Sequence, residues 1–191
     1  MTDMITALNR YHPKYALICR VMNETGLRVS DTLNLKRRDF ERNNGVKMVS
    51  EKKTRKKRQF IISENLRNDI LAFAKREVIR AEEFIFPSTD MNRCKSVSRH
   101  QVYKVFKRAA KAAGIEGVIS PHSCRKTYAR RKYQEHGDIF ELQRDMRHTK
   151  METTLGYLVD APTQQKPNED NTESVKIHPI FADILGKYGI T

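Results

Sequence analysis

The chain has 191 residues, with 37 lysines and arginines against 23 aspartates and glutamates, which gives a formal net charge of +14. This length suits one domain with a hydrophobic core and a short appendage, while the lack of a long apolar run or signal sequence disfavours a membrane-spanning or secreted protein. The positive charge predicts a polyanionic partner. Nucleic acid is favoured over an acidic membrane surface, because no long helix pairs a basic face with a bulky apolar one.

Three cysteines, Cys19, Cys94 and Cys124, are widely separated and match no metal-ligand or redox spacing. We expect them to be reduced thiols in a cytoplasmic protein. No cluster of carboxylates accompanies the other candidate residues, so the sequence predicts neither a metal site nor a cofactor.

The first predicted helix covers residues 14–25, and Gly26 can adopt the left-handed conformation that ends it. Ser30 is a candidate cap for a second helix that carries Leu33 inward. Arg28 therefore lies in a tight connection between two helices. An arginine in such a place is usually just exposed, but two rigid helices can also hold it as a phosphate clamp.

Two strands are predicted at residues 46–49 and 59–62, which makes a β-hairpin the simplest interpretation. The run KKTRKKR between them has six positive charges in seven positions. Most of these side chains suit a solvated loop, although their combined field also suits attraction to phosphates. Of these side chains, we expect that Lys53, at the base of the run, can stay close enough to the core to be held in position.

Two further helices follow. Ser63 caps one over residues 64–80, and Ser98 caps another that runs to residue 113 and is closed by Gly114. The second has a buried side and a basic side, which is either a solvated face or a surface that tracks phosphates. The buried residues are Val102, Val105, Phe106 and Ala109, and the outward ones are Arg99, Lys104, Lys107, Arg108 and Lys111.

The stretch from Ser120 to Tyr157 contains the groups best suited to phosphate chemistry. His122 and Arg125 lie three apart on a helix that begins at Ser120-Pro121, and Gly137 ends it. Asp138 begins another helix, His148 follows in a turn, and a last short helix carries Tyr157. Arginine matches phosphate oxygens, histidine moves a proton near neutral pH, and a tyrosine hydroxyl can attack phosphorus. Taken singly, each is more often a solvated or half-buried residue.

Together these motifs resemble the catalytic domain of the tyrosine recombinase (phage integrase) family. TGLRVSDTL resembles the first arginine motif, EKKTRKKR the hairpin lysine, PHSCRKTYA the HxxR box, and RHTKMETTLGY the second histidine with the nucleophilic tyrosine. There are two departures: Arg147 stands where a glycine usually precedes the histidine, and Gly156 directly precedes the tyrosine. The resemblance implies an α+β, mainly α-helical fold with a small antiparallel β-sheet or hairpin at its edge.

The resemblance also implies roles for six residues. Tyr157 would attack a scissile DNA phosphate to form a 3′-phosphotyrosine, while Arg28 and Arg125 hold the non-bridging oxygens and His148 adds a hydrogen bond. Lys53 would protonate the leaving oxygen, with Lys52, Lys56 and Lys57 as competitors, and His122 would assist proton movement at the tyrosine. Asp31 either orients groups of the site or is simply favoured by a helix dipole. The residues expected to contact DNA are Lys52, Arg55, Lys56, Lys57, Arg58, Arg99, Lys104 and Lys107.

This interpretation divides the chain into a catalytic domain at residues 1–160, a flexible linker at 161–174 and a tail with a short helix at 175–191. The tail either docks on its own domain or is exchanged between subunits. Family members normally carry an additional N-terminal domain, so this chain is either an excised catalytic domain or a naturally short recombinase. Double-stranded DNA and a homo-oligomer on it, from dimer to tetramer, are the expected partners, in a cytoplasmic, DNA-associated setting without a membrane.

Three other classes of protein stay open. A type IB topoisomerase would share the nucleophile and clamp but would not pair two DNA sites. A non-catalytic DNA-binding module would explain the charge but not the ordered set of phosphate-chemistry residues. A metal-dependent nuclease would need clustered carboxylates.

Overall fold

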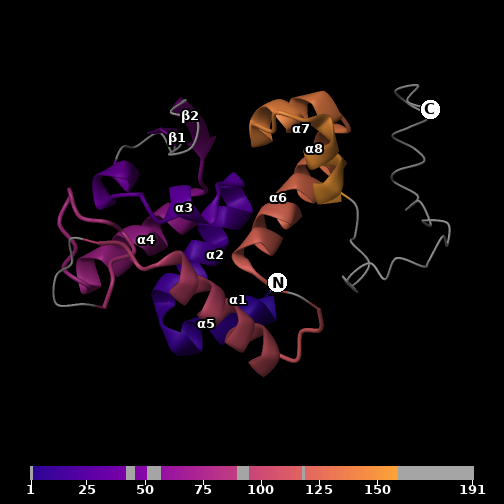
Figure 1. Cartoon of the computed structure of the whole chain (residues 1–191). Coiled ribbons are helices and arrows are strands. Elements are labelled where there is room, and N and C mark those ends of the chain that lie inside the picture. The colour runs from indigo at the N-terminus through magenta and orange to yellow at the C-terminus, as the bar shows by residue number, and fades with distance from the viewer. Residues whose placement is uncertain (1, 42–45, 51–56, 90–94, 118, 159–191) are drawn as a thin grey trace, which may run out of the picture. The chain divides into compact units, whose positions relative to one another are not determined.

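The computed structural model describes residues 2–41, 46–50, 57–89, 95–117 and 119–158, with the backbone alone at residues 2, 46–50 and 57–60. It divides into two compact units, Met1–Tyr128 and Ala129–Thr191. Lys53 with most of its basic run, Cys94, the predicted linker and the tail lie outside the described residues. Figure 1 labels every element except η1. The helices are α1 (Thr2–Tyr11), α2 (Pro13–Thr25), α3 (Val29–Thr32), η1 (Arg37–Phe40), α4 (Glu64–Arg76), α5 (Arg99–Ala112), α6 (Pro121–His136), α7 (Ile139–Met146) and α8 (Met151–Leu158), and the strands are β1 (Val46–Ser50) and β2 (Lys57–Ile61).

Helix α2 lies at the centre of the first unit, in contact with α1, α4 and α5. Nearly all of its length is buried, with Ile18, Cys19 and Val21 having no exposed surface. Its ends are well defined, since the His12 side chain accepts a hydrogen bond from the Lys14 N–H and the Gly26 N–H donates to the Met22 carbonyl. A helix buried on this many sides organises the core rather than covering it.

Helix α1 is absent from the sequence prediction, which placed the first helix at residue 14. Its buried residues Met4, Ala7 and Leu8 are spaced three and four apart, so a helical pattern is present but short. It packs on α2 and α5, and this tertiary contact stabilises a segment that is marginal alone.

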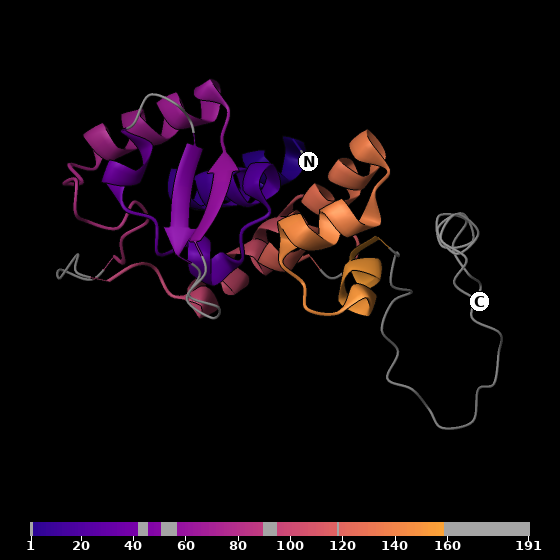
Figure 2. The ribbon, with the colours of Figure 1, turned by 90° about the horizontal axis from the view of Figure 1, so that it is seen from above.

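Strands β1 and β2 pair antiparallel, from Val46 opposite Ile61 to Ser50 opposite Lys57 (Figure 2). The predicted strands differ from these by one or two residues at their ends. The two-stranded sheet follows η1 and precedes α4, as the predicted hairpin does, and β2 contacts α2.

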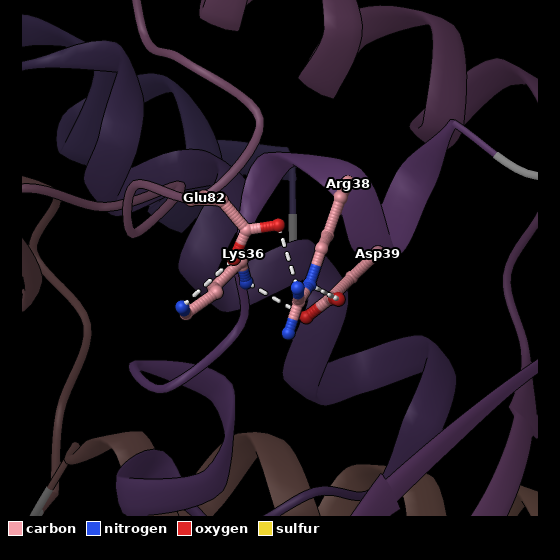
Figure 3. Close-up of polar contacts among 4 residues, drawn as sticks. All are labelled: Lys36, Arg38, Asp39 and Glu82. Atoms are coloured by element: carbon pink, nitrogen blue, oxygen red, sulfur yellow. Dashed lines mark hydrogen bonds and ion pairs between the residues drawn. The ribbon is translucent and has the colours of Figure 1, made fainter.

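A second, shorter pairing joins the segment before the hairpin to the loop after α4. Lys36 and Phe84 form an antiparallel bridge, and the Ile85 N–H donates to the Leu35 carbonyl. Figure 3 shows the side chains that reinforce it: Glu82 accepts from Lys36 Nζ at 3.2 Å and from Arg38 Nη1 at 2.5 Å. These two hydrogen bonds hold the pKa of Glu82 below its ordinary value, so the network weakens in acid.

Helices α4 and α5 begin at the predicted caps, because Ser63 accepts from the Leu66 N–H and Ser98 from the Gln101 N–H. Helix α4 ends at Arg76 rather than at the predicted residue 80. Val78 adopts φ 53°, its N–H donates to the Lys75 carbonyl, and the Ile79 N–H reaches back to the Ala74 carbonyl. This is the hydrogen-bond pattern that usually ends a helix on a glycine, so a valine there gave no stop signal.

The predicted faces of α5 are confirmed: Val102, Val105, Phe106 and Ala109 are buried, and Arg99, Lys104, Lys107, Arg108 and Lys111 are exposed.

In the second unit α7 packs on α8, with Leu142, Met146 and Leu158 buried. Asp138 caps α7 as predicted, since its carboxylate accepts from the Phe140 and Glu141 N–H groups. The boundary between the units falls within α6. Among the described residues, none of the helices is both long and apolar enough to span a membrane.

Candidate active site

The connection between α2 and α3 holds Arg28 in a rigid turn. Gly26 has φ 62° and closes α2, Leu27 has no exposed surface, and Arg28 takes an extended backbone conformation immediately before α3. The predicted cap Ser30 is wrong, because it lies inside α3. The carbonyl of Arg28 already accepts from the N–H groups of Asp31 and Thr32, at 2.9 Å each. Arg28 itself is half-buried.

Arg125, on α6, is the second arginine of the site and is 1% exposed. Its Nη1 donates to the carbonyl oxygen of Gly26, 99 positions earlier in the chain. The two arginines are thereby joined through a hydrogen bond and two peptide units. Burial of a guanidinium is unfavourable unless its donors are used, and a fixed, desolvated guanidinium is well suited to an anion.

Gly26 is also in contact with the ring of Tyr128. A Cβ atom at position 26 would lie 2.4 Å from Tyr128 Cδ1 and 2.7 Å from Cε1. Because the residue also has a left-handed backbone, both the lack of space and the backbone conformation favour glycine at this position. The Gly26 carbonyl can accept a hydrogen bond from Arg125 only because the turn lies this close to α6.

His122 lies one helical turn before Arg125 and keeps much of its surface exposed. Its ring is nonetheless partly desolvated, which is the main reason that its pKa lies below the ordinary value, followed by the positive charges of Arg125, Lys126 and Arg28. The electrostatic influence of both arginines indicates that Arg28, His122 and Arg125 share one positive region of the first unit. A lowered pKa favours the uncharged ring at neutral pH, and in that form His122 is able to accept a proton.

Asp31 is only 3% exposed, three residues after Arg28. A buried carboxylate must be compensated by donors or charges, so Asp31 is held in a fixed environment beside the Arg28 turn.

The second unit brings His148 and Tyr157 together. Their ring centroids are 4.8 Å apart with an interplanar angle of 51°. His148 is held at its backbone by Gln143, whose carbonyl accepts from the His148 N–H at 3.1 Å and whose Nε2 donates to the His148 carbonyl at 3.2 Å. Tyr157 is 9% exposed.

Thr154 is the residue of this site that the sequence did not reveal. Its hydroxyl lies 3.1 Å from His148 Nδ1, and the threonine has no exposed surface. The only available signal was its position three residues before Tyr157, which places both on one side of α8.

The two departures noted in the sequence have structural explanations. Arg147 ends α7 with φ 52°, the conformation for which a glycine is suited, and this costs an L-residue about 1–2 kcal/mol. A Cβ atom at Gly156 would meet nothing within 4 Å, so packing does not require that glycine.

The remaining predicted residues are only partly described. Lys52, Lys53, Arg55 and Lys56 lie outside the described residues, and Lys57 and Arg58 are described as backbone of β2 alone. Arg99, Lys104 and Lys107 lie on the exposed face of α5. Within the described ranges no group of three or more histidines, cysteines, aspartates or glutamates could hold a metal ion.

A mainly helical fold with arginine, histidine and tyrosine in this order is that of a tyrosine recombinase catalytic domain. Residues 1–164 match the model of the phage integrase family, and the chain belongs to that family of enzymes. It is 34% identical over 151 residues to the probable integrase/recombinase YoeC of Bacillus subtilis (strain 168), a match that covers 79% of this chain and 80% of YoeC.

Two solved structures are similar in fold. One is the XerH site-specific recombinase bound to palindromic difH substrate in a post-cleavage complex, with a TM-score of 0.68 at 19% identity, covering 83% of this chain and 47% of XerH. The other is a λ integrase(75–356) dimer bound to a COC′ core site, with a TM-score of 0.64 at 20% identity, covering 89% of this chain and 60% of the λ integrase chain. The match therefore spans about half of the XerH chain and three fifths of the λ integrase(75–356) chain.

Proposed function

We propose that this protein is a site-specific DNA recombinase that cleaves and rejoins double-stranded DNA through a 3′-phosphotyrosine without a metal ion, acting in the cytoplasm. The observation that carries the proposal is the convergence of Arg28, His122 and Arg125 in one positive region. Two arginines, one of them fixed by the Gly26 carbonyl, supply the charge that a phosphoryl transition state needs. The relatives named above support DNA as the substrate.

In the proposed reaction the Tyr157 hydroxyl oxygen attacks the scissile phosphorus and the bond to the 5′ oxygen breaks. The tyrosine proton passes to His122, which its lowered pKa keeps neutral, and the departing oxygen takes a proton from Lys53. Arg28 and Arg125 stabilise the charge on the non-bridging oxygens, and His148 donates a further hydrogen bond. Reversal with another 5′-hydroxyl rejoins the strand, because the phosphodiester energy is kept in the covalent intermediate.

The exposed basic face of α5 is the proposed DNA-tracking surface in the described structure. Arg99, Lys104 and Lys107 belong to it, and the exposed Arg108 and Lys111 extend it. Binding through phosphate contacts of this kind weakens steeply with salt. Lys52, Arg55, Lys56, Lys57 and Arg58 are proposed to add to this surface from the hairpin.

The proposal includes assembly on DNA, from dimer to tetramer. The λ integrase dimer on its core site supports it by analogy. Residues 161–174 would then link the catalytic domain to a tail at 175–191 that passes to a neighbouring subunit. Deletion of residues 175–191 should leave a folded protein that binds DNA but pairs two sites poorly. Unchanged pairing would instead favour docking of the tail on its own domain.

The test is covalent capture, which does not require the target sequence to be known. The protein is incubated in EDTA with a pool of nicked duplexes of randomised sequence, so that cleavage releases a short strand and traps the protein on DNA. We expect a covalent product that survives denaturation and is absent with Tyr157→Phe. No product, or one that requires a divalent metal, would contradict the proposal. Site pairing by the selected sequence then distinguishes a recombinase from a topoisomerase.

A further inference from the structure

Thr154 has a hydroxyl group with one defined partner. The residue has no exposed surface, and within the described part of the chain its Oγ1 is in hydrogen-bond contact with His148 Nδ1 at 3.1 Å. A buried hydroxyl that donates no hydrogen bond is strongly unfavourable, so its proton should point to the nearest acceptor. That acceptor is Nδ1 of the imidazole.

The direction of this bond decides which histidine nitrogen carries the proton. If Thr154 donates to Nδ1, the neutral ring must have its own proton on Nε2, because only one nitrogen of a neutral imidazole is protonated. The backbone of His148 is already fixed by its two hydrogen bonds with Gln143. The hydroxyl therefore sets both the rotation of the ring and its tautomer.

Thr154 also lies close to the proposed nucleophile, Tyr157. It lies one turn before Tyr157 on α8, while the His148 ring packs against the Tyr157 ring at 4.8 Å. A rotation of the imidazole would thus disturb the tyrosine as well. The neighbouring Thr153 is exposed and takes no part in this arrangement.

We propose that Thr154 is a positioning residue, which holds His148 in the Nε2-protonated tautomer so that Nε2–H can donate to the scissile phosphate. The proposal rests on the function proposed above for the role of the phosphate, but the hydrogen bond and the tautomer stand without it. A merely structural Thr154 would fill space in the second unit and leave the tautomer unchanged.

Three substitutions separate these roles. Thr154→Val keeps the shape and removes the hydroxyl, Thr154→Ser keeps the hydroxyl and removes a methyl group, and Thr153→Val makes the same chemical change one residue away at an exposed position. Thermal unfolding of each variant shows whether it folds.

The first measurement is the tautomer, read from the ring nitrogen shifts of ¹⁵N-histidine-labelled protein without DNA, with the His148 signals assigned by their loss in His148→Gln. We expect the Nε2-protonated form in the parent protein, Thr154→Ser and Thr153→Val, and a mixture of tautomers in Thr154→Val. An Nδ1-protonated ring in the parent protein would overturn the proposal even if no variant folded. So would an unchanged tautomer in Thr154→Val.

The second measurement is the rate of covalent trapping on a selected nicked duplex. Thr154→Val should lower it roughly five- to tenfold, the ratio that corresponds to one hydrogen bond, while the other two variants stay within about twofold. In a His148→Ala background Thr154→Val should add no further loss, because it acts only through the histidine. An equal loss in Thr154→Ser would favour a packing role. If the parent protein traps no DNA, the proposed function fails, whereas the nitrogen shifts still decide the tautomer.

Discussion

Gly26→Ala adds one methyl group at a position where the structure leaves no room for it. The new Cβ would lie 2.4, 2.7 and 2.9 Å from three carbons of the Tyr128 ring, at a residue with φ 62°. The left-handed backbone costs an alanine about 1–2 kcal/mol. Forcing the aromatic ring aside adds about 1–3 kcal/mol, as in other overpacked cores.

Gly114→Ala is a matched control. Gly114 has φ 64°, but a Cβ atom there would meet nothing within 4 Å. It should therefore show the backbone contribution alone. At about 3 °C for each kcal/mol in a chain of this length, we expect Gly26→Ala to lower the melting temperature by about 6–15 °C, and Gly114→Ala by about 3–6 °C.

Two measurements check this expectation: thermal or urea unfolding, and covalent trapping on nicked DNA. Gly26→Ala should also slow trapping, because a shifted turn moves the carbonyl that holds Arg125. Adding Tyr128→Leu to Gly26→Ala should recover part of the stability by making room for the methyl group. If Gly26→Ala and Gly114→Ala lowered the melting temperature by the same amount, the steric conflict with Tyr128 would be refuted.

Three further predictions follow from the site. Arg28→Ala and Arg125→Ala should each slow DNA cleavage about a hundredfold or more, which is the scale for removing one preorganised donor. A variant that cleaves DNA as fast as the parent protein in a single-turnover assay would contradict the proposed phosphate clamp. His122 must be neutral to accept the proton, so the cleavage rate should rise with pH through the lowered pKa of His122, which lies below the ordinary 6.5. Lys126→Gln removes a positive charge that lowers this pKa, so it should move the midpoint of the pH profile upward. An unmoved midpoint would exclude His122 as the group that accepts the proton. Gly156→Ala should stabilise the protein by about 0.5–1 kcal/mol in urea unfolding, because alanine suits a helix better and no atom obstructs it, and destabilisation would contradict this.

Much of the local structure could be predicted because it depends on neighbouring residues. Ser63, Ser98 and Asp138 cap their helices through bonds to N–H groups two or three residues away, and the spacing of apolar residues defined the buried side of α5. The exceptions arise where an unusual residue replaces the usual signal. Val78 follows the end of α4 with a left-handed backbone normally given to glycine, so the sequence offered no stop there.

The site was predicted as a set of residue types but not as an arrangement. Gly26 was identified only as a helix end, whereas its two main contacts come from Arg125 and Tyr128, about a hundred positions later. Thr154 was overlooked because a threonine in a helix has no distinctive pattern until its hydroxyl is seen against His148. Contacts of this kind depend on how helices pack, which periodicity alone does not determine.

The most direct test of the proposed chemistry is to identify the amino acid that becomes linked to DNA. Covalent product formed in EDTA is digested with protease and nuclease, and the nucleotide-bearing peptide is sequenced by mass spectrometry. We predict a phosphodiester between Tyr157 and a 3′ nucleotide. Linkage to another residue such as Tyr128 or Tyr133, or to a 5′ nucleotide, would contradict the assignment of the nucleophile and the proposed reaction.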